Sequence, residues 1–289
     1  MMQWTTLVQA QALAVHLRQP QLRIFDCRYS LAPAAQGGGP EAGLRMYRQG
    51  HVSGALYADL ERDLSDMSQT GQGRHPWPDA QAFGQWLGRM GVDADTQVVA
   101  YDAGDGAFAA RFWCLLRMFG HAHVAVLDGG LAAWTQADLP VEPGDVEPSA
   151  GPAYRGSFQH ARLLDAQAVQ QALHAGEPLI DARAAERFRG EVEPIDAVAG
   201  HVPGAINRPY ASNLDNGHFK SAPVLRREFE TLLGDRKPAD AIAMCGSGVT
   251  ACHHALAMAH AGLPLPRLYT GSWSGWISDP ARPVATGPR

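Results

Sequence analysis

The sequence contains two copies of one pattern, and this internal repeat constrains the fold more than any other feature. Three segments of the first half return in the second: GHVSGALYADL (50–60) as GHVPGAINRPY (200–210), LRIFDCR (22–28) as PLIDAR (178–183), and VVAYDAGDGAFAARFWCLLRMFG (98–120) as AIAMCGSGVTACHHALAMAHAG (241–262). The segments follow the same order in both halves. We therefore predict two tandem copies of one domain.

Short apolar runs alternate with amphipathic segments in each half. The runs RIFD, QVVAY and VAVL of the first half correspond to LIDA, AIAM and PRLY of the second, and all six are strand-like. The segments DAQAFGQWLGRMG (79–91) and LRREFETLLGD (225–235) carry apolar residues at helical spacing. This alternation predicts an α/β fold in which each half forms a mostly parallel central sheet flanked by helices.

A segment of different composition separates the two halves. VEPGDVEPSAGPAYRG (141–156) is rich in proline, glycine and acidic residues and has no periodicity. Such a composition is typical of a linker. We therefore predict a first domain at residues 1–140, a linker at 141–156 and a second domain at 157–289.

Composition excludes several kinds of partner. The 289 residues carry a formal net charge of -5, so the chain lacks the concentrated basic surface that nucleic acids and anionic membranes require. No apolar run reaches the length of a membrane span, and the first residues lack the pattern of a secretory signal. We therefore expect a cytoplasmic protein with neither nucleic acid nor membrane as a partner. Cys27, Cys114, Cys245 and Cys252 show no CxxC spacing, which predicts free thiols.

Cys245 occupies a position where a thiol can become reactive. It follows the apolar run AIAM and precedes GSGVTA, where a strand must turn into a helix that begins near Thr250. Glycines allow the backbone N–H groups of such a turn to point inward, and the helix dipole points at the same place. Both effects favour the thiolate, which is the nucleophilic form. We predict a nucleophilic Cys245; the alternative is a buried structural cysteine in a tight turn.

This loop is also where the chain resembles a known family. The CGSGVTA loop, the paired GHVxGA segments and the GSWSGW turn are similar to those of two-domain rhodanese-type sulfurtransferases, and the loop resembles that of the 3-mercaptopyruvate sulfurtransferases among them. The resemblance implies tandem rhodanese-like domains with the catalytic Cys245 in the second. Asp102 stands at the matching position of the first copy. Because a carboxylate cannot carry sulfane sulfur, the first domain would be catalytically silent.

The resemblance also implies an activity. Cys245 would take sulfur from a small-molecule donor, 3-mercaptopyruvate, and hold it as a persulfide. The acceptor would be a thiol, such as a thioredoxin-like protein or a dithiol, or cyanide, and no metal or organic cofactor is implied. The charged sulfur would be stabilised by the loop amides, from Gly246 through Ser247, Gly248, Val249 and Thr250 to Ala251. Since two domains with a buried cleft require no partner subunit, we expect a monomer.

Arginines of the second half are candidates for binding the donor's carboxylate. Arg187, in DARAAERFRG, aligns with a family arginine of that role, and a guanidinium pairs with a carboxylate bidentately. Arg183 and Arg189 are neighbouring alternatives. Mercaptopyruvate enzymes usually have a second arginine in a segment like EPR, whereas this chain reads EPID, with Ile195 at that position. The absence of this second arginine argues against mercaptopyruvate as the donor.

The loop argues in the opposite direction. Thiosulfate enzymes of the family often carry cationic side chains inside the loop, where this chain has Gly246 and Ser247. A doubly charged donor would therefore meet amides without loop cations. Because the loop contacts the reacting sulfur, we give it more weight than Ile195 and predict 3-mercaptopyruvate as the donor, with thiosulfate as the alternative.

A proton relay is the second implication of the resemblance. In the mercaptopyruvate enzymes, a serine that matches Ser247 is placed with a histidine that matches His75 and an acid that matches Glu61. Both partners of Ser247 come from the first half, so the relay is expected to form between the two domains. It would protonate the enolate of the departing pyruvate. The alternative is that Ser247 only shapes the loop, while His75 and Glu61 are ordinary polar groups.

Two other functions compete with this interpretation. Cysteine phosphatases and arsenate reductases also use a cysteine in an amide-lined loop, but they need an arginine that closes the loop, where this chain has Ala251. A persulfide carrier without turnover of small donors would need Cys245 just as an enzyme does. Arg187 favours the enzyme, because it suits a small carboxylate donor.

Overall fold

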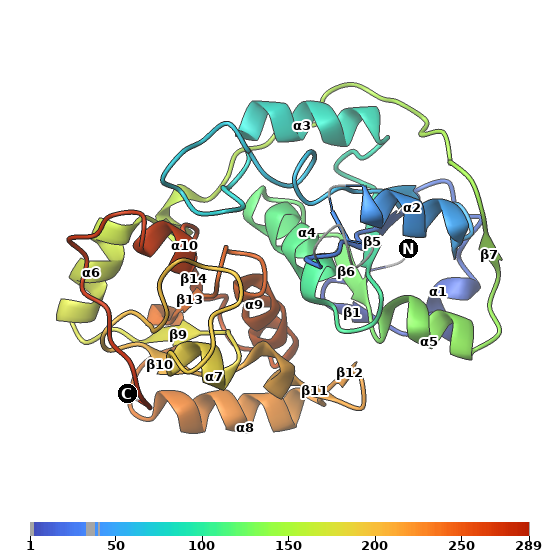
Figure 1. Ribbon diagram of the computed structural model, residues 1–289. Coiled ribbons are helices and arrows are strands. Elements are labelled where there is room, and N and C mark those ends of the chain that lie inside the picture. Colours follow the sequence, from blue (N-terminus) through green and yellow to red (C-terminus); the bar gives the residue numbers. More distant parts are fainter. Residues whose placement is uncertain (1–2, 33–37, 40, 289) are drawn as a thin grey trace. The chain divides into compact units, whose positions relative to one another are not determined.

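The structure of the chain is a computed structural model that describes residues 3–32, 38–39 and 41–288. The chain divides into two compact units, each with its own central sheet (Figure 1). Unit 1 comprises residues 1–66 and 78–158, and unit 2 comprises residues 67–77 and 159–289. None of the helices that the structure describes has the length and the apolar character needed to span a bilayer.

Unit 1 is built on a five-stranded parallel sheet. Its strands lie in the order β1 (Leu7–Val8), β6 (Val124–Leu127), β5 (Gln97–Tyr101), β2 (Leu22–Asp26) and β4 (Leu56–Tyr57). Its helices are α1 (Ala10–Ala14), α2 (Ala42–Gln49), α3 (Ala80–Arg89), α4 (Ala107–Met118) and α5 (Gly130–Gln136). Because strand side chains alternate between the two faces, Ile24 of β2 packs in a core with residues of α1 and α5, whereas Phe25 contacts Trp86 of α3 and Phe112 of α4.

Unit 2 has a sheet with the corresponding strand order. Its strands, all parallel, are β8 (Leu163–Leu164), β14 (Arg267–Tyr269), β13 (Ile242–Met244), β9 (Leu179–Asp181) and β10 (Ile206–Asn207). Its α-helices are α6 (Ala166–His174), α7 (Ala185–Phe188), α8 (Ala222–Leu233), α9 (Ala251–His260) and α10 (Ser272–Trp276). Leu179 packs in a core with α6 and α10, and Ile180 packs in a second core with α8 and α9. The predicted α/β fold is confirmed, and the six strand-like runs lie in β2, β5, β6, β9, β13 and β14.

Short elements complete the two units. They are the single-turn helices η2 (His160–Arg162), η3 (Tyr210–Asn213) and η4 (Pro238–Asp240), the antiparallel pair β11 (Leu214–Asp215) and β12 (His218–Phe219), and the antiparallel pair β3 (His51–Val52) and β7 (Val141–Glu142).

The Asp-x-Arg motifs of the two halves make matching buried contacts. Arg28 Nη2 pairs with Asp26 at 2.6 Å and donates to the carbonyl oxygen of Gly50. Arg183 Nη2 pairs with Asp181 at 2.7 Å and donates to the carbonyl oxygen of Gly200. Each guanidinium therefore ties the end of a strand to the start of a GHVxGA segment, which gives Arg183 a structural role.

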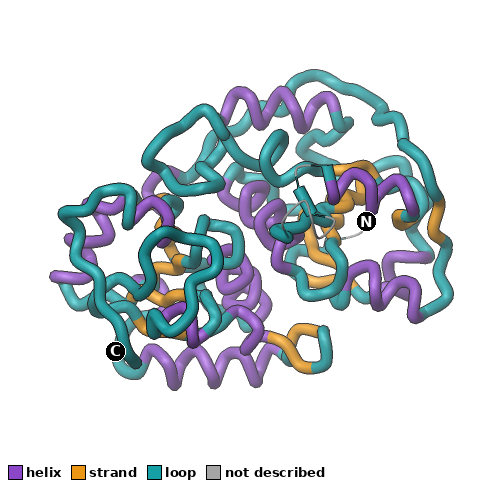
Figure 2. The backbone as a smooth tube through the Cα atoms, in the orientation of Figure 1, coloured by secondary structure: helices purple, strands orange, loops and turns teal. Residues whose placement is uncertain are grey.

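The segment that the sequence predicts as a linker lies against unit 1. Figure 2 shows it as loop except at β7, which pairs with β3. Gly151 and Tyr154 donate backbone hydrogen bonds to carbonyl groups of α3, and Phe158 stacks on Phe83. The structure adds that residues 67–77 group with unit 2, although residues of unit 1 flank them in the sequence. The predicted boundaries do not include this crossing.

Candidate active site

Cys245 lies at the carboxyl end of β13, the strand between β9 and β14. Its backbone is held by the start of α10, because its N–H donates to Ser272 Oγ at 3.1 Å and its carbonyl oxygen accepts from the N–H of Trp273 at 2.9 Å. The residue is 1% exposed. The sequence placed this cysteine at a strand end, and the structure has it there, between a buried strand and helix α9.

The loop after Cys245 brings one backbone amide to the sulfur. The N–H of Gly248 donates to Cys245 Sγ at 3.2 Å. Gly248 has a φ of 81°, a conformation that favours glycine, so the turn depends on that residue. Val249 and Thr250 accept hydrogen bonds in the first turn, and α9 begins at Ala251. The loop therefore brings the N–H of Gly248 to the sulfur just before α9 begins.

Ser247 contacts His75 within unit 2. His75 Nδ1 and Ser247 Oγ are joined by a hydrogen bond of 2.8 Å, and both side chains are buried. His75 belongs to residues 67–77, which group with unit 2 although they lie within the first domain predicted from the sequence. Gly73 allows this segment to pack closely against the turn that contains Gly271. It has a φ of 89°, and a Cβ at this position would lie 2.4 Å from the carbonyl oxygen of Gly271.

Glu61 lies in unit 1. Its carboxylate accepts a hydrogen bond of 2.5 Å from the hydroxyl of Tyr29. Burial, together with this carboxylate, raises the pKa of Tyr29 above its ordinary value, so the hydroxyl keeps its proton and remains a donor. A role of Glu61 beside His75 stays a prediction.

Two guanidinium groups lie over Gly246, the residue that follows Cys245. A Cβ at Gly246 would lie 3.0 Å from Arg74 Nη2 and 3.7 Å from both Nη atoms of Arg187. Arg187 comes from α7, and the N–H of Arg74 donates to Ser274 Oγ at 3.0 Å. The structure therefore brings Arg187 to the loop, and it adds Arg74, which sequence reasoning missed. In the sequence, Arg74 could have been recognised as a site residue only because it precedes the candidate residue His75 in GRHPWP.

The other arginine candidates lie elsewhere. Arg183 is buried in its pair with Asp181 and stacks on Trp273, with its Cζ 4.7 Å from the ring centre. Arg189 pairs with the exposed Glu191 at 2.7 Å. Ile195, at the position of the expected second arginine, is 44% exposed. The second guanidinium at the loop therefore comes from a segment distant in sequence.

Both guanidinium groups at the loop are paired with acids. Glu193 binds Arg187 Nη2 at 2.7 Å and also accepts the backbone N–H groups of Ile195 and Asp196. Asp196 binds Arg187 Nη2 at 3.1 Å and forms a close ion pair with Arg74. Although burial opposes ionisation of Glu193, these hydrogen bonds lower its pKa. Burial raises the pKa of Asp196, and the negative charge of the nearby Glu193 adds to this effect, whereas Arg74 acts in the opposite direction.

In unit 1, Asp102 occupies the position that matches Cys245. Its carboxylate accepts four backbone hydrogen bonds of 2.9 to 3.1 Å from the loop that leads into α4; the donors are the N–H groups of Gly104, Gly106, Phe108 and Ala109. Burial and the neighbouring Asp105 raise the pKa of Asp102 to about 6, although the N–H groups of Gly104, Gly106 and Ala109 act in the opposite direction. The loop of unit 1 is thus filled by a carboxyl group of its own chain.

The remaining titratable residues give no metal site. In the part of the chain that the structure describes, no group of three or more His, Cys, Asp or Glu side chains is placed to hold a metal ion. His253 and His254 are buried, and the Nδ1 atoms of both accept from Asn213 Nδ2. All four cysteines are free thiols.

Comparison with known proteins decides the family. The model of the rhodanese-like domain matches twice, at residues 9–137 and 165–279. A Pseudomonas aeruginosa protein named "Probable 3-mercaptopyruvate sulfurtransferase" is 48% identical over 285 residues, which cover 97% of this chain and 98% of that protein. The chain belongs to the two-domain rhodanese-type sulfurtransferases. It is thus an enzyme of the class that the sequence resemblance predicted.

Two further proteins are similar to this chain, one in sequence and one in structure. A Mycobacterium tuberculosis protein named provisionally as a thiosulfate sulfurtransferase is 43% identical over 253 residues, covering 85% of this chain and 86% of that protein. The crystal structure of SseA from Escherichia coli, described among the 3-mercaptopyruvate sulfotransferases, superposes with a TM-score of 0.80 at 34% identity. That match covers 94% of this chain and 100% of the other. Both rhodanese-type relatives extend over most of the present chain.

Proposed function

We propose that this sulfurtransferase uses 3-mercaptopyruvate as its donor and Cys245 as the residue that carries the sulfur. The observation that carries the proposal is the pair of guanidinium groups, Arg74 and Arg187, over Gly246 and therefore beside Cys245. Guanidinium groups bind carboxylates with strong, oriented hydrogen bonds, so the pair suits the donor's carboxylate. The name of the Pseudomonas aeruginosa relative supports the same donor.

The transfer step balances without a cofactor. The Cys245 thiolate attacks the sulfur of 3-mercaptopyruvate, so an S–S bond forms while the bond between that sulfur and C3 breaks. The electron pair of the broken bond remains on C3 as the enolate of pyruvate. The thiol proton of the donor is transferred to C3, and the products are pyruvate and a Cys245 persulfide anion. A thiol or cyanide then attacks the outer sulfur and regenerates the Cys245 thiolate.

Ser247 and His75 are proposed to carry the proton in this step. Their hydrogen bond of 2.8 Å supports a path from the donor's thiol through the serine hydroxyl to the imidazole and back to C3. Glu61 is proposed as the acid that orients His75. Gly246, Gly248, Val249, Thr250 and Ala251 are proposed to stabilise the charged sulfur through their amides, with support from the contact between Gly248 and Cys245.

Thiosulfate is the second candidate donor. The guanidinium pair also suits a dianion, and the Mycobacterium tuberculosis relative is named for thiosulfate. Sulfite leaves thiosulfate without protonation at carbon, so thiosulfate makes no use of a proton relay.

Steady-state rates with the two donors test the proposal. We expect kcat/KM for 3-mercaptopyruvate to exceed that for thiosulfate by well over about tenfold, with either cyanide or a dithiol as acceptor. A preference for thiosulfate would make thiosulfate the donor. Absence of turnover with both donors would favour the persulfide carrier.

Ser247→Ala tests the relay with the same assay. We expect kcat with 3-mercaptopyruvate to fall about 10- to 100-fold, because general acid–base catalysis is lost, and the rate with thiosulfate to change by less than about threefold. The matched control is Ser221→Ala, which removes an exposed hydroxyl that makes no capping hydrogen bond. Equal losses with both donors would contradict the relay and leave Ser247 as a residue that shapes the loop.

The finer properties of the protein are proposals as well. We propose that unit 1 is catalytically silent, since a carboxyl group fills its loop, and that the two units are copies of one domain, since their Asp-x-Arg motifs make the same contacts. The proposed domain boundaries are 1–140, 141–156 and 157–289. A cytoplasmic monomer that uses a thioredoxin-like protein, a dithiol or cyanide as acceptor is supported by the sequence arguments above.

A further inference from the structure

The carboxylate of Asp196 binds the guanidinium pair in the way that a donor anion would. One of its oxygens, Oδ1, pairs with Arg74 Nη1, and the other, Oδ2, accepts from Arg187 Nη2 at 3.1 Å. The side chain is 4% exposed. A single carboxylate thus bridges both cations that lie over Gly246.

Glu193 and Asp196 are held differently, although both contact Arg187. Glu193 is anchored to its own loop, because two backbone N–H groups donate to Oε1. Among the described residues, the hydrogen bonds to the carboxylate of Asp196 come from Arg74 and Arg187. Asp196 can therefore move away from the guanidinium groups without breaking a backbone contact of its carboxylate.

The two acids also set the charge of the site. Arg74 and Arg187 contribute two positive charges, and Glu193 and Asp196 contribute two negative charges when ionised. An incoming monoanion meets a balanced site, whereas a dianion adds a second negative charge next to a buried carboxylate. Like charges at close range are costly where water is excluded.

We propose that Asp196 is a specificity-determining residue that competes with donor anions for Arg74 and Arg187 and selects monoanionic donors over dianionic ones. The inference rests on the proposed function only in that the donor's anionic group binds this pair. It gives a physical reason for the proposed preference for 3-mercaptopyruvate over thiosulfate at a loop that has two guanidinium groups beside it. Burial, with a further contribution from the nearby Glu193, raises the pKa of Asp196.

The proposal is tested by anion binding, which does not depend on turnover. In a Cys245→Ser background, the Kd values of pyruvate, a monoanion, and sulfate, a dianion, are measured by calorimetry with and without Asp196→Asn. We expect Asp196→Asn to tighten sulfate binding at least about tenfold and pyruvate binding about threefold, because the removed charge acts twice on a dianion. In the enzyme with Cys245 intact, KM for thiosulfate should fall in the same proportion, with kcat changed less than about twofold.

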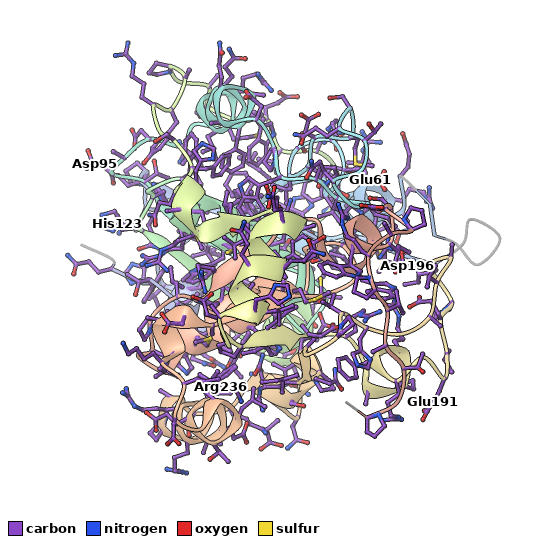
Figure 3. All side chains as sticks on the ribbon, turned by 90° about the vertical axis from the view of Figure 1, so that its left-hand side faces the viewer. Glu61, Asp95, His123, Glu191, Asp196 and Arg236 are labelled. Carbon is purple, nitrogen blue, oxygen red and sulfur yellow. The ribbon has the colours of Figure 1, made fainter. Side chains whose placement is uncertain are left out.

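Matched variants separate charge from structure. Glu191→Gln removes one negative charge from an exposed side chain that pairs with Arg189, and it should leave both Kd values unchanged. Figure 3 labels both acids, Asp196 and Glu191. Asp196→Glu keeps the charge and should keep the preference for the monoanion. If Asp196→Asn does not fold, Asp196→Ser is measured in its place.

The outcomes distinguish this inference from the proposed function. Sulfate and pyruvate affinities that change by the same factor in Asp196→Asn, or not at all, would overturn the role of Asp196 whatever the donor is. If wild-type enzyme prefers thiosulfate in turnover while the sulfate affinity still rises tenfold in the variant, the proposed donor is wrong and the competition by Asp196 stands.

Discussion

Replacing Cys245 with serine is expected to lower kcat/KM at least about a thousandfold with 3-mercaptopyruvate and with thiosulfate alike. The serine hydroxyl is nearly isosteric and can accept the N–H of Gly248, so the loop should keep its shape. A hydroxyl is a far weaker nucleophile than a thiolate and forms no persulfide. The loop of unit 1 offers Asp102 at the matching position, so no second nucleophile is expected to sustain turnover. Rates with both donors, and mass spectrometry of the enzyme after donor alone, check the result.

Cys252→Ser is the matched control for this variant. Cys252 lies in α9, and its thiol donates to the carbonyl oxygen of Gly248 at 3.4 Å, a contact that a serine hydroxyl can also make. We expect its kcat/KM to stay within about twofold of wild type, since the reacting sulfur is retained. The wild-type enzyme should gain 32 Da, one sulfur atom, on reaction with donor. Activity above a tenth of wild type in Cys245→Ser would remove Cys245 from the mechanism.

Replacing Arg187 with glutamine is expected to lower kcat/KM for 3-mercaptopyruvate about a hundredfold, mostly through KM. Two causes act together. The donor loses a guanidinium beside Gly246, and Glu193 and Asp196 are left with one cation fewer, so the site becomes negative and repels an anion. Steady-state kinetics over a range of donor concentrations separate KM from kcat, and circular dichroism with thermal unfolding checks the fold.

Arg189→Gln is the control that separates the effect of a guanidinium placed at Gly246 from the loss of one positive charge. Arg189 lies two residues from Arg187, and its replacement by glutamine removes the same charge. Its described ion pair is with Glu191, at the surface. We expect its kcat/KM to remain within about twofold of wild type, because an exposed ion pair contributes little. Equal losses in the two variants would show that the overall charge, rather than the guanidinium at Gly246, governs donor binding.

Much of unit 2 around Cys245 was predictable, because it depends on neighbours in sequence. An apolar run that ends at Cys245, a glycine turn and an alanine-rich helix each follow from local backbone preferences and hydrophobic spacing. The sequence repeat likewise predicted two copies of one domain, and the two sheets have corresponding strand orders; the Asp102 position followed from the alignment of the two copies. The structure adds the contacts of this residue: the carboxylate of Asp102 accepts hydrogen bonds from backbone N–H groups of its own loop.

The arginines near the loop were only partly predictable. Sequence reasoning named Arg187, which lies beside Gly246, but looked for a second cation at position 195, where the exposed Ile195 lies. Arg74 is separated from Asp196 by 122 residues, and its contact with the loop depends on residues 67–77 packing with unit 2. No local pattern encodes a contact of that kind. The same packing places His75 against Ser247.

The sequence by itself determined the α/β class, the two-domain repeat and the place of Cys245 between a strand and a helix, because strand, turn and helix arise from residues adjacent in the chain. Tertiary structure alone decided which cations surround that thiol and which acids neutralise them. Side chains from residues 74, 187, 193 and 196 meet there only after the chain has folded. Their charges interact over a few ångströms in a partly buried site, and the linear order of residues does not contain this spatial arrangement.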